Sequence, residues 1–337
     1  MRAPRPGRLS HPRSVRAEPP RAGRLAVFAP SPILTVTIEA RSGRAEVHLH
    51  PGGQGFWVAR MAANLEAEVV LCCTLGGEPG RVLSGLMDGD PLVLRAAEAD
   101  TPNGLYIHDR RSGDRVEIVN VDSQPLTRHA ADERYGITLA AGLDADVTLI
   151  TGSQPDDVVE ADLYRRLVSD LRANGKTVIA DLTGAPLRAV LEGGIDLLKL
   201  SSEELLSERL ASSESVADIV AAGRRVQQAG ARTVLVSRGA DPAILVEAGG
   251  HPTTIQLSAP VFEALDHRGA GDSMFAAIGV ALARGMDATA AARLGMAAGA
   301  LNVTRRGLGT GTRYEIERLV EHVSQCAVAL RSGGERS

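Results

Sequence analysis

Near the carboxyl-terminal end of this 337-residue chain, Gly269, Ala270 and Gly271 stand directly before Asp272, and an apolar run covers residues 274–283. The small residues leave room for a ligand to reach the backbone. A helix over the apolar run would point its unpaired N–H groups and its positive dipole end at the same place. The pattern predicts an anion site beside a carboxylate that can take a proton from a hydroxyl. An ordinary helix start is the alternative, because Asp is a common N-cap and Gly a common turn residue.

The elements that must position these residues follow a regular alternation in the second half of the chain. Apolar strands are predicted at residues 147–150, 177–181, 197–200, 233–237 and 243–247, with helices at 158–173, 187–191 and 215–228. This alternation indicates a largely parallel sheet covered by helices on both faces. Two strand pairs, within residues 33–50 and 104–121, do not follow it. They predict a small β-sheet that projects as a lid.

Composition separates a tail from a folded domain. Residues 1–24 hold seven Arg, five Pro and a single acid, and we expect a disordered basic tail there, before one domain at residues 25–330. The tail carries a net charge of +6, so the total of −4 for the whole chain leaves −10 on the folded domain. An acidic domain argues against a nucleic-acid partner. No apolar run approaches the roughly 18 residues of a membrane span. The three cysteines form no disulfide framework, and Cys72 and Cys73 are expected in a buried strand, as in a cytoplasmic protein.

Several common enzyme motifs are missing from the sequence. There is no G-x-x-x-x-G-K-[ST] of a Walker-type NTPase and no G-x-S-x-G of a serine hydrolase. The run from Gly76 to Gly80 follows a predicted strand but lacks dinucleotide-binding spacing, so we interpret it as a tight turn and disfavour a nicotinamide-linked oxidoreductase. The histidines show no metal-ligand spacing and are interpreted as surface or structural residues.

Further landmarks occur in a fixed order along the chain. They are Pro51-Gly52-Gly53-x-Gly55-x-x-Val58-Ala59-Arg60, Gly76-Gly77, Thr151-Gly152-Ser153-x-Pro155, Asp181-x-x-Gly184, Lys199-x-Ser201-x-x-Glu204, Val236-Ser237-x-Gly239-Ala240-Asp241 and Gly269-Ala270-Gly271-Asp272-Ser273. Together they resemble the ribokinase-like (PfkB) carbohydrate kinases over roughly residues 25–320. The resemblance is to the phosphofructokinase-like branch, which includes 1-phosphofructokinases and tagatose-6-phosphate kinases.

The resemblance implies a three-layer α/β/α sandwich with a β lid, and ATP- and Mg²⁺-dependent phosphorylation of a sugar or sugar-phosphate hydroxyl. It makes Asp272 the general base and Gly269, Ala270 and Gly271 the anion hole. Lys199, Ser237, Gly239 and Glu204 are implied at the nucleotide, with Glu204 in the metal shell, and Thr35, Gly52, Gly53, Gln54 and Ser153 at the acceptor. A homodimer through the lid is also suggested. Without the resemblance, we would interpret Lys199 as a residue at the end of a strand and Glu204 as an ordinary acidic residue in the first turn of a helix.

The departures from the family pattern lie mainly on the acceptor side. Thr35 stands where the family has an Asp, Gln54 at a Lys or Gly position, Trp57 for an Asn and Pro102 for an Arg. Ser201 also replaces the Asn of the family's K-P-N stretch. The residues implied in phosphoryl transfer match the family pattern, while those of the acceptor site are altered. The sequence therefore does not identify the acceptor molecule. A non-catalytic nucleotide- or sugar-binding protein on the same fold is the alternative.

Overall fold

A computed structural model describes residues 22–248, 253–305 and 307–328. Within them, ten strands form one sheet in the order β14-β13-β12-β11-β10-β9-β8-β1-β4-β5. Neighbours from β5 to β11 are parallel, and β12, β13 and β14 are added antiparallel. The strands are β1 (Arg24–Ala29), β4 (Glu68–Gly76), β5 (Val93–Ala99), β8 (Val147–Thr151), β9 (Thr177–Asp181), β10 (Ile195–Ser201), β11 (Ala231–Arg238), β12 (Asp241–Glu247), β13 (Thr254–Ser258) and β14 (Ser324–Ala327).

Helices cover both faces of this sheet, because side chains alternate between two apolar layers along its strands. In β1, Val27 packs into one layer and Phe28 into the other. The Val27 layer is covered by α1 (Gln54–Asn64), α2 (Gly77–Met87), α8 (Ala270–Ala283), α9 (Ala288–Asn302) and α10 (Arg313–Val320). The opposite face carries α3 (Arg128–Asp144), α4 (Ala161–Ala173), α5 (Gly184–Gly193), α6 (Ser202–Ser207) and α7 (Val216–Ala229). The expected α/β/α sandwich with a largely parallel sheet is confirmed.

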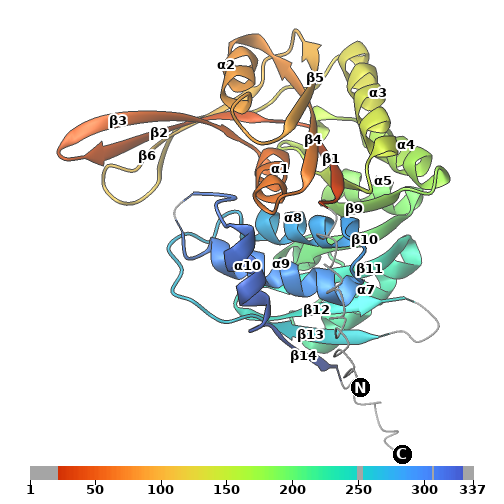
Figure 1. The fold of residues 1–337 in the computed structure, drawn as a ribbon. Coiled ribbons are helices and arrows are strands. Elements are labelled where there is room, and N and C mark those ends of the chain that lie inside the picture. The colour runs from red at the N-terminus through yellow and green to blue at the C-terminus, as the bar shows by residue number, and fades with distance from the viewer. Residues whose placement is uncertain (1–21, 249–252, 306, 329–337) are drawn as a thin grey trace, which may run out of the picture.

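A second, smaller sheet extends away from this body (Figure 1). It has the order β3-β2-β6-β7, from β2 (Ile33–Arg41), β3 (Arg44–Gly52), β6 (Gly104–Asp109) and β7 (Val116–Val121). We call it the lid sheet. Its strands lie where the sequence predicted them, and the central pair, β2 and β6, is parallel. The two halves of the lid sheet therefore enter from separate parts of the chain.

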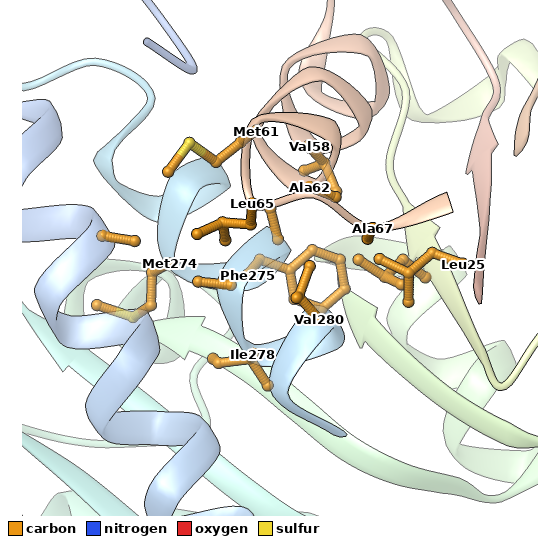
Figure 2. Packing of buried hydrophobic residues seen from close by; sticks show 14 of the residues in the cluster. Leu25, Val58, Met61, Ala62, Leu65, Ala67, Met274, Phe275, Ile278 and Val280 are labelled. Atoms are coloured by element: carbon orange, nitrogen blue, oxygen red, sulfur yellow. The ribbon is translucent and has the colours of Figure 1, made fainter. Parts of the chain in front are cut away.

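The packing of α8 fixes the position of the Gly269–Asp272 region. Met274, Phe275 and Ile278 of α8 pack in the same core as Met61 of α1 and Leu65, which directly follows α1 (Figure 2). A Cβ on Gly279 would stand 2.9 Å from the side chain of Leu149 in β8, so this glycine lets α8 lie close to the sheet. The start of α8 is thereby held at the carboxyl edge of the parallel strands.

Some parts of the structure differ from the sequence predictions or lie beyond them. Strands β5, β13 and β14 were not predicted. The basic tail expected at residues 1–24 lies outside the described residues up to position 21, and Arg24 already belongs to β1. Cys72 and Cys73 are buried in β4, as expected. In the described part of the chain, no helix combines the length and apolar character needed to cross a membrane.

Candidate active site

Residues of the predicted site meet at the carboxyl ends of β8, β9 and β10. Thr151, Asp181 and Lys199 are direct neighbours across these three parallel strands. Loops that leave this edge of a parallel sheet are the usual place for ligands in open α/β folds. The first turn of α8 reaches the same edge, because a Cβ on Gly271 would stand 2.9 Å from Nζ of Lys199.

A cavity of about 1060 Å³ lies between this edge and the lid sheet. Among the predicted residues, it is lined by Thr35, Gly52, Gly53, Gln54, Ser153, Glu204 and Asp272. Trp57, which stands where the family pattern has an Asn, also lines it. The structure thus brings the predicted acceptor residues and the predicted base to one space, large enough for a small organic ligand.

The backbone at the start of α8 is shaped to leave its amides uncapped. Gly269 is the N-cap and has a φ of 70°, in the left-handed region that favours glycine. It has no side chain to accept the first N–H groups of the helix. Asn302 of α9 fixes the turn from behind: its amide donates to the carbonyl of Arg268 at 2.7 Å, and Oδ1 accepts from the Ser273 hydroxyl at 3.0 Å. These two hydrogen bonds fix the turn at the start of α8, next to Arg268 and Asp272, which line the cavity.

A buried ion pair lies beneath this turn. Nζ of Lys199 is 3.0 Å from Oδ2 of Asp181, and the two side chains are 6% and 3% exposed. Burial lowers the pKa of Lys199, but the charges of Asp181, Glu204 and Asp272 outweigh that effect and leave it raised. Lys199 is therefore charged at neutral pH, with its ammonium against the bare backbone of Gly271.

The carboxylates here outnumber the cations that face them. Burial raises the pKa of Asp272 to about 7; the charge of Asp181 adds to this, Lys199 opposes it and Glu204 adds to it. Burial likewise raises the pKa of Asp181 to about 6, against the stabilising charge of Lys199. Asp272 thus combines a position on the cavity wall with a pKa near neutrality, which is what a general base at pH 7 requires.

Gln54 connects the acceptor side of the cavity to the buried ion pair. Its Oε1 accepts the N–H of Gly152 at 2.9 Å. Its side chain also acts as a hydrogen-bond partner that lowers the pKa of Asp181. The Gln54 amide thus bridges the loop after β8 and the carboxylate at the end of β9. The sequence analysis placed this residue at the acceptor and noted its departure from a Lys or Gly pattern, but it did not predict these two contacts.

Glu204 has a structural and an electrostatic role at once. It forms a capping box with Ser201 at the start of α6, in which the Ser201 N–H donates to Oε2 of Glu204 at 2.6 Å and the Glu204 N–H donates to Oγ of Ser201 at 3.1 Å. A Ser can therefore serve at this N-cap in place of the family's Asn. Among the described residues, no three His, Cys, Asp or Glu side chains are arranged to hold a metal ion.

Six of the predicted site residues do not line the cavity: Lys199, Ser237, Gly239, Gly269, Ala270 and Gly271. Ser237, the second-last residue of β11, pairs with Ser201 of β10, and its hydroxyl donates to the carbonyl of Leu200 at 3.4 Å. Gly239, in the following turn, has a φ of 59°, and a Cβ there would meet open space. Both lie at the same sheet edge as Lys199, next to but outside the lining of the cavity.

The sequence analysis missed a group of basic and aromatic residues on the lid side. Thr35 of β2 has His50 of β3 and Tyr106 of β6 as direct neighbours across the lid sheet. Thr37 has His48 and His108 as neighbours in the same way. All six line the cavity, as do Arg60, Arg110, Arg115 and Arg268. No spacing rule identifies these histidines, because the pairing of distant strands brings them together.

Comparisons with known proteins agree with the geometry. A model of the "pfkB family carbohydrate kinase" matches residues 36–314. The ATP-dependent 6-phosphofructokinase isozyme 2 of Mycobacterium tuberculosis is 31% identical over 277 residues, covering 80% of this chain and 79% of that protein. Phosphofructokinase-2 from Escherichia coli in complex with fructose-6-phosphate has a TM-score of 0.75 at 23% identity, covering 89% of this chain and 98% of that one. Arabidopsis thaliana ribokinase complexed with ribose and ATP has a TM-score of 0.70 at 22% identity, covering 89% and 99%.

The raised pKa of Asp272 predicts a pH-dependent gain in stability for Asp272→Asn. Between pH 3.8, the ordinary value, and about 7, the folded state binds a proton that the unfolded state does not, so the free energy of unfolding falls as pH rises through this window. Above it, the ionised carboxylate destabilises the fold by roughly 1–2 kcal/mol after discounting for solvent screening. We expect the Asn variant to melt higher than the wild type at pH 8 and the gain to shrink toward pH 4.

Thermal unfolding of both proteins between pH 4 and 8 measures this difference. Asp114→Asn, in an exposed turn of the lid sheet, is the matched control and should show no such pH-dependent gain. An Asp272→Asn gain that is the same at pH 4 and pH 8 would contradict the charge explanation.

Proposed function

Because this chain belongs to the pfkB family of carbohydrate kinases, we propose that it transfers the γ-phosphoryl group of ATP to a hydroxyl of a sugar or sugar phosphate. The resemblance stated from the sequence is confirmed, and family membership favours an enzyme over a non-catalytic binding protein. The observation that carries the proposal is the position of Asp272, on the wall of a large cavity in the uncapped first turn of α8.

In the proposed reaction, Asp272 acts as the general base. The acceptor hydroxyl loses its proton to the Asp272 carboxylate while its oxygen forms a bond to the γ-phosphorus. The bond from that phosphorus to the β–γ bridging oxygen breaks, and ADP leaves with the electron pair. A pKa of about 7 lets the carboxylate accept a proton and release it to solvent in each turnover at neutral pH.

We assign the stabilisation of the moving phosphoryl group to the start of α8. The backbone N–H groups of Ala270, Gly271 and Asp272 are free of any side-chain cap, since Gly269 offers none. The Lys199 ammonium lies directly behind Gly271, where it adds positive charge to the same point. Phosphoryl transfer depends mainly on such positioning and electrostatic stabilisation. Gly269, Ala270 and Gly271 are thus proposed as the anion hole.

Magnesium is the metal that this reaction class uses to neutralise nucleotide phosphates. Asp181, Glu204 and Asp272 share one cation, Lys199, so the site carries unbalanced negative charge. Such a site suits a hydrated Mg²⁺ carried by the phosphates, with Glu204 in its outer shell, because Mg²⁺ keeps several waters and needs few protein ligands. Lys199, Ser237 and Gly239 are proposed on the nucleotide side.

The acceptor is proposed to bind between the lid sheet and Gln54. The Escherichia coli structure holds fructose-6-phosphate, and the cavity of this chain has room for a molecule of that size. Thr35 offers one hydroxyl in place of a carboxylate, and a Cβ on Gly52 would lie 2.5 Å from its Oγ1, so the backbone is closely packed here. With Gly53 and Ser153, these groups are proposed to bind hydroxyls of the acceptor.

We also propose that the protein works in the cytoplasm. Cys72 and Cys73 are adjacent buried thiols rather than disulfide partners, and burial raises the pKa of each to about 12. They therefore act as small apolar residues of the core, a use that suits a reducing compartment.

Replacing Asp272 by Ala tests the catalytic assignment. We expect turnover to fall by about two to four orders of magnitude with little change in the KM for ATP, since a general base acts in the transition state. ATP consumption over a panel of sugars and sugar phosphates measures this. Asp114→Ala is the control. Near-normal turnover in Asp272→Ala would contradict the role of Asp272 as general base. If the wild type bound ATP but phosphorylated none of the acceptors, the result would favour a non-catalytic binding protein.

A homodimer through the outer face of the lid sheet is a further part of the proposal. Leu49, Val36, Ile107 and Val119 form one row across the four strands of the lid sheet, on the face away from the cavity. Leu49 and Val119 are 45% and 39% exposed. An exposed apolar sheet face of this kind commonly marks an association surface.

Val119→Glu tests the dimer, because a charge in an apolar interface is costly to bury. We expect the wild type to sediment as a dimer and the variant to shift toward the monomer at the same concentration. Val261→Glu, in an exposed segment outside the lid sheet, is the control. A monomeric wild type, or an unchanged mass for Val119→Glu, would contradict this interface.

A further inference from the structure

The lid side of the cavity contains a buried imidazole with an unused nitrogen. His108 is 1% exposed, and its Nε2 lies 3.2 Å from the Thr37 hydroxyl. Its Nδ1 is buried and has no hydrogen-bond partner among the described residues. With the Thr37 hydroxyl donating to Nε2, Nδ1 carries the proton and is a free donor. An unpaired donor at this depth is costly unless a ligand uses it.

Positive charge gathers around this imidazole. Burial lowers the pKa of His108, and the charges of Arg110, His50 and Arg268 lower it further, so these groups approach it from three elements. The Tyr106 ring stacks on His108 at 5.2 Å, and the Arg115 guanidinium lies 5.2 Å from the centre of the Tyr106 ring. The cluster therefore includes strands of the lid sheet and the loop before α8.

Two of these arginines lack carboxylate partners. Arg110 pairs with Asp266 at 3.3 Å, which ties the lid sheet to the loop before α8. Arg115 and Arg268, by contrast, form no ion pair within the described residues, and Nε of Arg115 is buried without a hydrogen-bond partner. Glu117, beside His108 in the lid sheet, and Glu39 line the cavity as well. Two unpaired guanidinium groups and a free imidazole donor form a complementary site for a small anion.

Resting on the proposed kinase function, we propose that His108, Arg115 and Arg268 form an anion subsite at the lid end of the cavity. The acceptor is then an anionic polyol, held there by a phosphate or carboxylate group while one of its hydroxyls faces Asp272. Pro102 replaces an Arg of the family pattern and offers no hydrogen-bond donor, so the subsite uses different residues. Arg268 stands four positions before Asp272, which couples anion binding to the base through a single loop.

Matched acceptors and single substitutions test this subsite. Fructose, fructose 6-phosphate, gluconate and 6-phosphogluconate separate neutral, phosphate and carboxylate acceptors. For the wild type, we expect kcat/KM of at least one anionic member to exceed that of fructose by about 100-fold or more, since charge-assisted hydrogen bonds are strong. Arg268→Gln and Arg115→Gln should each reduce this ratio by about 10- to 100-fold. Arg111→Gln, paired with Asp109 in the same hairpin and outside the cavity, is the matched control.

The outcomes separate the alternatives. A selective loss with phosphorylated acceptors assigns the anion as phosphate, and a selective loss with gluconate assigns it as carboxylate; both support the subsite. Equal losses with neutral and anionic acceptors, or a rise only in the KM for ATP, would overturn it. A wild-type kcat/KM that is higher for fructose than for every anionic acceptor would also overturn the subsite.

A binding measurement keeps the subsite testable if no acceptor is turned over, a result that would count against the proposed function alone. Inorganic phosphate and the four acceptors are added to the wild type and to the Arg115→Gln/Arg268→Gln double variant, and the melting temperature is followed. A rise with phosphate or an anionic acceptor in the wild type that is lost in the double variant supports the subsite. No anion-dependent rise in the wild type, or the same rise in both proteins, overturns it.

Discussion

The site depends on the buried pair of Lys199 and Asp181 at the carboxyl edge of the sheet. A lone charge buried at this depth would be strongly unfavourable, so each member is retained in its charged form by the other. The pair supplies positive charge behind the first turn of α8 and leaves Asp272 and Glu204 without a cation of their own. In the proposed reaction, its geometry therefore sets both where the phosphoryl group is stabilised and how readily Asp272 accepts a proton.

Small residues allow this arrangement to be so compact. Because Gly271 has no side chain, the Lys199 ammonium can lie against its backbone. A Cβ on Gly299 of α9 would lie 3.1 Å from the carbonyl oxygen of Ala270, so this glycine lets α9 approach α8 closely. Asn302, one turn further along α9, bonds to both sides of the Gly269–Asp272 turn. The two helices thus share one small-residue contact, and the start of α8 is positioned by α9 as much as by the sheet. Precise placement of this kind is what catalysis by positioning requires.

The sequence was sufficient for the parts of the molecule that have local signals. The alternation of strands and helices, the Gly269–Asp272 turn and the two strand pairs of the lid sheet were predicted from periodicity and short motifs. Strands β13 and β14 were missed because they are short and at most half apolar, and β5, at the opposite edge of the sheet, was missed because Arg95 and Glu98 interrupt its apolar residues. His50 and His108 were set aside because their meeting depends on the parallel pairing of β2 with β6, which no local pattern encodes. Gln54 was expected at the acceptor, but its contacts were not predicted, since its two partners, Gly152 and Asp181, lie far away along the chain.

The alternation of side chains between the two faces of β2 limits which mutations this protein can accept during evolution. Thr35 and Thr37 face the cavity, while Val36, between them, lies in the apolar row on the opposite face. Inserting or deleting one residue in β2 would exchange these faces, because side chains of a strand repeat every second position. Under the binding site and the dimer proposed above, acceptor binding and dimerisation would then be lost together. The lid sheet, although it extends from the body, should therefore tolerate changes of residue type far better than changes of length.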